Sequence, residues 1–582
     1  MKKAIQYIPL VLIILLMSMP AIQMRWQIFD IKPLDGAFTL AEQPHFTKKA
    51  WNSGEFQEGI EKYLKDNAGF RPFLVRLQNQ VDYTFFRKGN AEGATIGKTR
   101  QLYEYDYIRS WLAIDDPGDI FITKKLNRAR YVQDYLKREK GIDLEIVFEP
   151  GKASFYPEYI PRKYTEKKNG PSTYERFVQK AKETGLDYID WEAWFQQLKP
   201  TSEYPLFPKY GTHWSVYGMK FAADSMLRFI GNRRGIKLGE FKVDRTETSR
   251  KPRDTDDDVA RTMNLLFPPS GELLAYPIFS FDTTNTADRP MVLVVADSYY
   301  WNIFNTRIPK NLFANEAFWY FNALVYPDYY YKPVRTENLD LLAEVEKQDV
   351  IFLMITERFV HKFDWMFIDN LYKLYTPEWL VDPVYDNINR IMQHDPWYND
   401  VIVKAKKNGI SLEDALILDA RYVYNMDDTA GFMIRFGPLY YRRMISNDPG
   451  WTAKIREKAA GQGISEDEML EKDALFMFRQ NYPSFYEMNR AITAKEEALQ
   501  ADPAAMDSVN RMSEQYRFDK EQMLWLCAER GYREDEINRI SQIIRSDEKW
   551  LADVKKKALE QNIPLDEMIR KDAVWVYEQK FK

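Results

Sequence analysis

His213 stands in the polar segment Lys-Tyr-Gly-Thr-His-Trp-Ser-Val-Tyr-Gly-Met at residues 209–219 and is one of four histidines in 582 residues. Imidazole titrates near neutrality, so it is the side chain best suited to take a proton from a serine hydroxyl and return it. Ser298 is the candidate partner, because an apolar run ends at Ala296 and ligands of open α/β sheets bind beyond the carboxyl ends of strands. A rare histidine and a strand-end serine together indicate acyl transfer.

Each of these two residues also has a purely structural interpretation. His213 is equally compatible with a hydrogen-bonded polar residue in a turn that enters a helix, and Ser298 with an ordinary helix N-cap. The sequence leaves these alternatives open.

The elements that would position the pair alternate between amphipathic helices and apolar strands. This alternation predicts a parallel sheet covered by helices on both faces. Helical patterns occupy residues 45–90, 119–140, 172–185 and 215–231, and strand patterns occupy residues 144–148, 188–190, 291–295 and 350–355.

The stretch from Lys237 to Asp288 is polar and contains Asp254, Asp256, Asp257 and Asp258. It lacks the glycine and the terminal glutamate of a calcium-binding loop, so we interpret it as a solvated excursion near the site.

The chain begins with Met-Lys-Lys and an apolar stretch from Ala4 to Ile22. This pattern is typical of an export signal or a single membrane anchor, and the bulky residues after it favour an uncleaved anchor at residues 1–24. The positive-inside rule then places everything after about residue 24 outside the cytoplasm. A formal net charge of −4 argues against a nucleic-acid binder.

Cys527 is the only cysteine, which excludes an internal disulfide and a zinc site built from cysteines. An exported chain without disulfides fits a bacterial envelope. The four histidines show no metal-ligand spacing, so we expect no bound metal.

From about residue 385 the sequence repeats. Asp395-Pro396, Asp448-Pro449, Asp502-Pro503 and Asp547-Glu548 each open a unit, and three units place a tryptophan soon after, at Trp397, Trp451 and Trp550. Each unit continues through a helix stop into a second capped helix. This predicts about four stacked helical hairpins at residues 385–582, after an α/β domain at residues 25–384; the partner of such an array is not evident from the sequence.

Several motifs in the middle of the chain resemble the AlgX/AlgJ family of SGNH-hydrolase-like polysaccharide O-acetyltransferases of the bacterial envelope. The resemblance covers roughly residues 45–370. It is carried by Gly-Thr-His-Trp at 211–214, Ala-Asp-Ser at 296–298, Thr-Glu-Arg at 356–358, Glu-Pro-Gly-Lys at 149–152, Tyr-Pro-Glu at 156–158 and Asp-Asn-Ala-Gly-Phe-Arg at 66–71.

This resemblance implies a flavodoxin-like sheet with a Ser-His-Asp triad, in which Ser298 is the nucleophile and His213 the base. The family usually has aspartate two residues before the histidine, whereas this chain has Gly211. The site is therefore a Ser-His dyad, a triad with a carboxylate from elsewhere, or an inactive site. Asp190 and Glu357 are the substitutes that we would test first.

The resemblance further implies an acetyl group passed from Ser298 to a sugar hydroxyl outside the cytoplasm. No bound cofactor is expected, and the donor would be delivered by a multi-spanning membrane O-acyltransferase. The backbone amide of Ser298 or Tyr299 would stabilise the oxyanion. Candidate substrate-binding residues are Lys152, Trp214, Tyr299 and Arg358, although the two aromatic residues are equally compatible with core packing.

The leading hypothesis is thus an envelope O-acetyltransferase that acts on an exopolysaccharide or other cell-surface glycan. One alternative is an acetylesterase that uses the same Ser298 and His213 with water as the acceptor. The other is an inactive glycan-binding or scaffold protein of a polysaccharide assembly system, which the glycine at position 211 favours.

Overall fold

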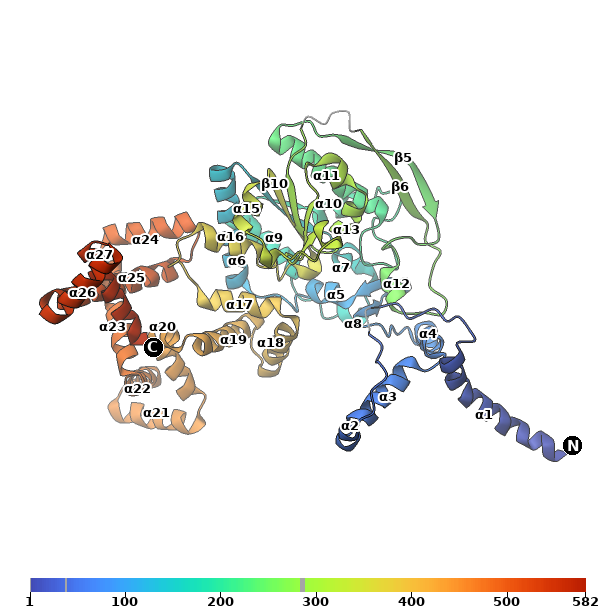
Figure 1. Ribbon diagram of the computed structural model, residues 1–582, viewed down its shortest axis with the longest axis horizontal. Helices are drawn as coiled ribbons and strands as arrows, with labels where there is room; N and C mark the ends of the chain where they lie inside the picture. Colours follow the sequence, from blue (N-terminus) through green and yellow to red (C-terminus); the bar gives the residue numbers. More distant parts are fainter. Residues whose placement is uncertain (1, 37–38, 283–287, 582) are drawn as a thin grey trace.

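The computed structural model describes residues 2–36, 39–282 and 288–581. An α/β domain lies at the centre, the C-terminal helices extend from one side of it, and the N-terminal helices lie on the other (Figure 1). Residues 283–287, at the end of the predicted polar excursion, lie outside the described residues.

The central sheet has six strands in the order β4-β3-β10-β7-β8-β9. Neighbouring strands are parallel except for the last pair, β8 and β9, which are antiparallel. The strands are β3 (Asp143–Glu149), β4 (Tyr188–Asp190), β7 (Val292–Ala296), β8 (Ala317–Tyr320), β9 (Leu324–Tyr326) and β10 (Val350–Thr356).

Alternate residues of these strands face two separate cores. Leu293 and Leu353 pack on one side with α6 (Asp119–Tyr135), α9 (Thr173–Thr184) and α16 (Phe367–Tyr375). Val294 and Phe352 pack on the other side with α10 (Trp191–Leu198), α11 (Val216–Arg234) and α13 (Tyr300–Asn305). The predicted sheet with helices on both faces is confirmed, with an antiparallel strand added at one edge.

Shorter elements surround this sheet. The antiparallel pair β5 (Glu240–Ser249) and β6 (Leu274–Asp282) occupies much of the predicted solvated excursion. The others are β1 (Ala94–Ile96), β2 (Leu102–Glu104), α5 (Tyr105–Trp111), α7 (Lys152–Phe155), α8 (Arg162–Thr165), α12 (Asp258–Thr262), α14 (Ile308–Leu312) and α15 (Leu341–Glu346). The N-terminal helices are α1 (Lys2–Trp26), α2 (Lys48–Ser53), α3 (Glu55–Asn67) and α4 (Arg71–Val81).

The C-terminal region is helical, as expected. Its helices are α17 (Pro383–Gln393), α18 (Asp395–Asn408), α19 (Leu412–Asp427), α20 (Thr429–Ser446), α21 (Pro449–Gln462), α22 (Glu466–Asn481), α23 (Pro483–Ala501), α24 (Pro503–Tyr516), α25 (Lys520–Ser546), α26 (Glu548–Gln561) and α27 (Leu565–Glu578).

Equivalent side chains make equivalent contacts in this region. The indole of Trp397 donates to Asp419, and that of Trp451 donates to Asp473, each over 3.4 Å. Lysines pair with the same carboxylates, and Lys557 pairs with Asp572 at the corresponding place in the last unit. The same kinds of side chain thus meet at corresponding positions in these three units.

The unit that opens at Asp502-Pro503 lacks these polar contacts because it packs against the α/β domain. Ala505, Met512 and Cys527 stand where the other units have tryptophan, lysine and aspartate. Met512 and Cys527 contact the core that contains α6 and α16, and Tyr372 donates a 2.7 Å hydrogen bond to the carbonyl of Tyr516. Apolar residues replace the polar set where the helices are docked.

The predicted domain boundary at residue 385 falls in the first turn of α17. The Tyr385 ring stacks on Phe121 of α6, and Tyr398 donates a 2.7 Å hydrogen bond to the carbonyl of Asp115. Lys125 of α6 is fully buried and donates a 3.3 Å hydrogen bond to Asn389 of α17. The first C-terminal helices therefore share a core with the α/β domain.

Candidate functional site

Ser298 lies just beyond the carboxyl end of β7, where a buried carboxylate fixes the turn. Asp297 accepts hydrogen bonds from the Tyr299 amide at 3.0 Å and from the amide and hydroxyl of Thr356 at 3.0 and 2.6 Å. Because Thr356 ends the neighbouring strand β10, the turn is tied to the sheet on two sides. This leaves the Ser298 side chain at the partly exposed edge of the sheet.

His213 reaches Ser298 from the turn before α11. Its Nε2 lies 2.9 Å from Ser298 Oγ, so the serine hydroxyl donates to the imidazole. The capping role of this turn belongs instead to Ser215, whose hydroxyl accepts from the Gly218 amide at 2.9 Å. The Ser298 side chain makes no cap bond to α13. Of the two interpretations that the sequence left open for each residue, the paired arrangement is the one present.

Asp258 completes the arrangement. Its Oδ2 lies 2.5 Å from His213 Nδ1, and its Oδ1 accepts hydrogen bonds from the amides of Thr212 and Val259 at 2.8 and 2.6 Å. A carboxylate on Nδ1 holds that nitrogen protonated and leaves Nε2 free to accept the serine proton. Ser298, His213 and Asp258 therefore have the geometry of a nucleophile, a base and an orienting acid.

The electrostatics of His213 follow from this contact. Burial by itself would lower the pKa of His213, but the hydrogen bond and the negative charge of Asp258 outweigh it and raise the pKa above its ordinary value. The imidazolium that forms when the serine is deprotonated is thereby stabilised.

The expected acids, Asp190 and Glu357, do not contact His213, and this expectation is corrected. Asp190 accepts from the Tyr174 hydroxyl at 2.5 Å and caps α10 through the Ala193 amide at 2.9 Å. Glu357 is buried, and burial raises its pKa well above the ordinary value. It accepts hydrogen bonds from the hydroxyl and the amide of Ser154. Both groups therefore bind the helices α10 and α7 rather than the imidazole.

Asp258 was missed because it belongs to the acidic cluster that we interpreted as a solvated loop. The cluster is only partly solvated: Asp256 is fully buried, and burial raises its pKa to about 7. A buried aspartate among charged neighbours is a signal of a functional loop, but four acidic residues in close succession do not reveal it in the sequence.

Gly211 explains how an acid from this loop can reach the histidine. A Cβ atom at position 211 would lie 2.5 Å from the Thr255 carbonyl oxygen and 2.9 Å from the Asp256 carbonyl. The side chain of an aspartate at position 211 would thus occupy the space that the 255–256 backbone now fills. The close packing of the 255–256 backbone on Gly211 therefore goes together with the contact of Asp258 with His213 Nδ1.

We expect Gly211→Ala to lower kcat/KM about 100-fold, because the methyl group pushes the Asp258 loop away and small misplacements at a catalytic centre are costly. Steady-state hydrolysis of an acetyl ester measures this. Gly461→Ala, at a glycine with nothing within 4 Å of the added Cβ, is the matched control. Full activity of the Gly211 variant with an unchanged melting temperature would contradict the close-approach argument.

Lys152, a predicted substrate-binding residue, is fully buried and faces the protein. Its Nζ donates to the carbonyls of Pro208 at 2.7 Å, Lys209 at 3.1 Å and Gly211. Burial lowers the pKa of Lys152 to about 7, although the nearby carboxylates, first among them Asp258, oppose this. The prediction of substrate contact is corrected: Lys152 holds the backbone of the turn that carries His213.

We expect Lys152→Met to reduce kcat about 100-fold with little change in KM, since the substitution leaves three carbonyls of the His213 turn without a donor. The exposed Lys163→Met is the control. A rise in KM at unchanged kcat would instead show that Lys152 contacts substrate.

The two aromatic candidates are also turned inward. Trp214 and Tyr299 are fully buried, and the Tyr299 hydroxyl donates a 2.8 Å hydrogen bond to the carbonyl of Thr212. The Tyr299 ring packs 4.9 Å from the His213 ring. Stacking on a sugar is therefore excluded for both in this conformation, and their packing orients the imidazole. Arg358 is partly exposed and pairs with Glu104 and Asp106, so substrate contact by Arg358 stays a prediction.

The oxyanion prediction named two amides. The Tyr299 amide is already engaged by Asp297 at 3.0 Å. The Ser298 amide has no acceptor within the described parts of the chain, which makes it the better-placed donor of the two.

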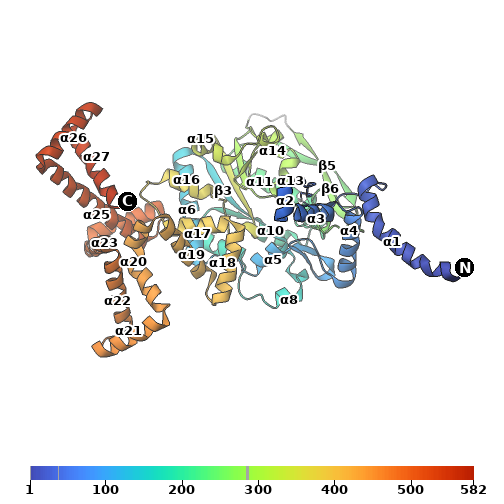
Figure 2. The same cartoon turned by 60° about the horizontal axis from the view of Figure 1, so that its bottom comes forward.

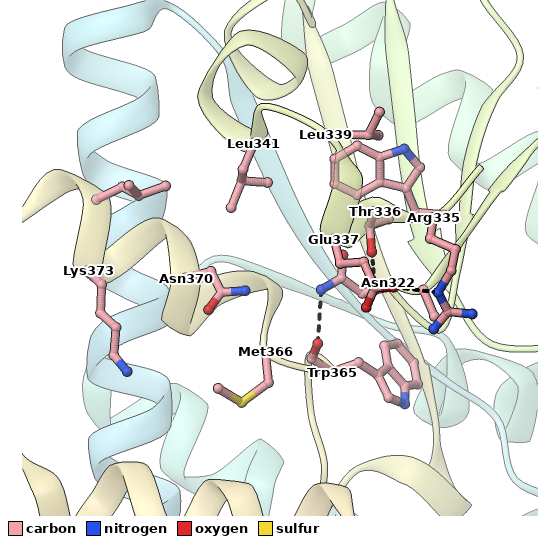
Figure 3. Close-up of a pocket in the computed structure, with 13 residues that line it drawn as sticks. Asn322, Arg335, Thr336, Glu337, Leu339, Leu341, Trp365, Met366, Asn370 and Lys373 are labelled. Atoms are coloured by element: carbon pink, nitrogen blue, oxygen red, sulfur yellow. Dashed lines mark hydrogen bonds and ion pairs between the residues drawn. The ribbon is translucent and has the colours of Figure 1, made fainter.

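A cavity of about 530 Å³ lies beside β8 on the α16 face of the sheet (Figure 3). Trp319, Leu339 and Leu341 form an apolar part of its lining, whereas Asn370 and Lys373 contribute polar groups. In Figure 3, the Asn322 side chain joins two walls through a 2.9 Å hydrogen bond to the Trp365 carbonyl. Apolar and polar side chains thus lie side by side in this lining.

The described residues contain no group of three or more histidine, cysteine, aspartate or glutamate side chains arranged to hold a metal ion. The contacts at Ser298 join it to His213, and His213 to Asp258, through side chains of the chain itself.

Part of this site lies in a segment that matches a known family model. Residues 111–270 match the family model described as SGNH hydrolase-like domain, acetyltransferase AlgX. The matched range contains His213 and Asp258 and ends before Ser298. A search of curated proteins found no match.

Several solved structures are similar to the chain, including the following three. The O-acetyltransferase domain of Pseudomonas putida AlgJ is 17% identical, with a TM-score of 0.33, over 48% of this chain and 98% of that one. Pseudomonas aeruginosa AlgX is 13% identical, with a TM-score of 0.30, over 48% and 67%. Bacillus cereus PatB1 is 10% identical, with a TM-score of 0.24, over 41% and 90%. Through residues 111–270, the chain is thus similar to the family of SGNH hydrolase-like acetyltransferases described by the AlgX model.

Proposed function

We propose that this protein is a cell-envelope O-acetyltransferase that moves an acetyl group through Ser298 to a hydroxyl of an exopolysaccharide or other cell-surface glycan. The observation that carries the proposal is the continuous Ser298-His213-Asp258 arrangement, with contacts of 2.9 and 2.5 Å. The match of residues 111–270 to the AlgX acetyltransferase model supports the same reaction class.

In the first half-reaction, Ser298 Oγ attacks the carbonyl carbon of the donor acetyl ester while His213 Nε2 takes the hydroxyl proton. The tetrahedral oxyanion is stabilised by the Ser298 amide. It collapses as the bond to the donor oxygen breaks and His213 protonates that leaving oxygen. The product is acetyl-Ser298.

In the second half-reaction, an acceptor sugar hydroxyl attacks the acetyl carbon while His213 takes its proton. Collapse breaks the bond to Ser298 Oγ, which recovers the proton from His213. The acetylated sugar leaves, and the enzyme is restored. Asp258 stabilises the imidazolium in both halves and keeps its own negative charge.

The membrane part of the proposal rests on α1. Tyr7–Trp26 is long and apolar enough to cross a membrane, with a mean hydropathy of 2.0, and Lys2 and Lys3 precede it. We place Lys2 and Lys3 in the cytoplasm and the chain after Trp26 in the periplasm. The donor acetyl group would then come from a multi-spanning membrane O-acyltransferase, because acetyl-CoA is cytoplasmic.

Hydrolysis is the alternative outcome at the same site, since water can replace the sugar as acceptor. The two are separated by incubating the full chain with p-nitrophenyl acetate and a panel of neutral and acidic oligosaccharides. Mass spectrometry of the sugars then reports transfer while released acetate reports hydrolysis. Acetylated sugar that disappears with Ser298→Ala supports the transferase. Ester consumption without acetylated sugar for any acceptor would favour an esterase.

The inactive-scaffold alternative was favoured by the missing acid at position 211. Asp258 now stands on His213 Nδ1 at 2.5 Å, so that reason no longer applies. Glycan binding that survives loss of Ser298 and His213, together with no turnover by the wild-type protein, would restore it.

A further inference from the structure

Helix α4 exposes apolar side chains to solvent, whereas an ordinary surface helix buries its apolar side chains. Its solvent-facing stripe consists of Leu74, Leu77 and Val81, exposed to 52%, 41% and 39%, and continues to Phe85 at 76%. Spacings of three, four and four residues place these side chains on one helical face. Large apolar side chains gathered on one exposed face mark an interaction surface.

Three polar side chains on the opposite side of α4 bind the protein, whereas Gln78 is exposed. Arg76 donates to the carbonyls of Lys32 and Pro33 at 2.7 and 2.5 Å. Asn79 donates to the carbonyl of Met263 at 2.8 Å, and Gln80 accepts from the amide of Phe267 at 2.9 Å. These specific bonds fix the rotation of the helix, so the apolar stripe cannot turn inward without breaking them.

The position of α4 identifies what covers the stripe. The turn before α4 packs on the membrane-spanning helix: the Gly69 amide donates a 3.1 Å hydrogen bond to the Pro20 carbonyl. A Cβ at Gly69 would overlap this carbonyl and would lie 2.6 Å from the Met24 amide nitrogen. Figures 1 and 2 both show α4 beside the C-terminal end of α1.

The depth of α4 relative to the bilayer follows from its contact with the helix α1. The apolar stretch Ala4–Ile22 is about 28 Å long as a helix, which matches the hydrocarbon core of a bilayer at about 30 Å. Pro20 lies about 3 Å of helix before the end of this stretch. The start of α4 is therefore held at the boundary between the acyl chains and the headgroups whenever α1 spans the bilayer. Exposed apolar side chains of Trp26, Ile28 and Phe29 lie at the same end of α1.

We propose that the Leu74-Leu77-Val81-Phe85 face of α4 lies in the lipid headgroup and acyl boundary of the membrane that α1 enters. An amphipathic helix in the plane of the interface buries its apolar face there. The inference rests on the anchoring by α1 stated under the proposed function. It adds that the α/β domain is held at a fixed height and orientation, rather than swinging on a tether.

The test uses the full chain, with Cys527→Ala, reconstituted in liposomes of pure phospholipid. A bimane fluorophore is attached at Leu77→Cys or Val81→Cys, and headgroup nitroxide lipids act as quenchers. We expect at least a twofold loss of fluorescence at both positions. Lys556→Cys on α26, where the native side chain is 79% exposed, is the control and should remain unquenched.

Leu16→Cys on α1, probed with acyl-chain nitroxides, separates the two claims. Quenching at positions 16 and 77 supports the proposal. Quenching at 16 without quenching at 77 or 81 overturns the α4 proposal and leaves the anchor in place, which would indicate a protein partner for the stripe. No quenching at 16 removes the anchoring and the inference together, without touching the chemistry at Ser298.

Discussion

Replacing Ser298 with alanine is expected to lower acetyl-ester turnover by about 10⁴-fold or more, because the nucleophile that forms the covalent intermediate is lost. His213→Ala should cost a similar factor, and the double variant should be no worse than either single one, since residues that act as a unit are not additive. Both side chains are partly exposed at the sheet edge, so the melting temperature should change little.

Initial rates with p-nitrophenyl acetate and thermal denaturation measure the two quantities. Ser270→Ala, at an exposed serine, is the matched control and should retain full activity. Losses that multiply in the double variant, or a parallel collapse of the melting temperature, would mean that the two residues act separately or only support the structure.

Asp258→Asn is expected to cost about 10⁴-fold in kcat, because an amide donor in place of the carboxylate favours the wrong imidazole tautomer. The pH profile gives a second readout. Asp258 raises the pKa of His213, so in the wild-type enzyme the neutral base is lost as the pH falls through a value above the ordinary imidazole pKa of about 6.5. In the variant, this acid limb should move to lower pH.

The same substitution should also change how the folding stability depends on pH. A raised pKa in the folded state means that protonated His213 stabilises the fold below the unfolded-state pKa, and that this stability is lost as the pH rises through the raised value. Asp258→Asn should therefore destabilise the protein more at pH 5.5 than at pH 8.5. Asp257→Asn, beside it and paired with Arg261, is the control. An unchanged acid limb of the activity profile would show that Asp258 does not raise the pKa of His213.

The sheet and two of the three site residues were predictable because they depend on local pattern. Continuous apolar runs define β7 and β10, β3 is apolar between its ends except at Glu145, and a polar residue after such a run lies at the carboxyl edge. The short strands β8 and β9 were not predicted: four and three residues rich in aromatics carry too little periodicity. They form one edge of the sheet and contribute none of the residues Ser298, His213 and Asp258.

The acid was not predictable, since its identity depends on a tertiary contact. Asp258 is 45 residues from His213 and reaches it only because the 255–256 backbone lies against Gly211. The roles of Lys152, Trp214 and Tyr299 also depend on tertiary contacts. Their polar or amphipathic side chains suggested contact with substrate near Ser298 and His213. Their burial, and hence their positioning role, is visible only in the fold.

The most direct test of the central claim is covalent labelling of the full chain with a serine-reactive fluorophosphonate, followed by peptide mapping. An activated Ser298 should be modified in the wild-type protein, not in His213→Ala, and far more slowly in Asp258→Asn. Labelling of Ser298 at equal rates in all three proteins, or no labelling of a folded wild-type protein, would contradict a catalytic Ser298-His213-Asp258 site.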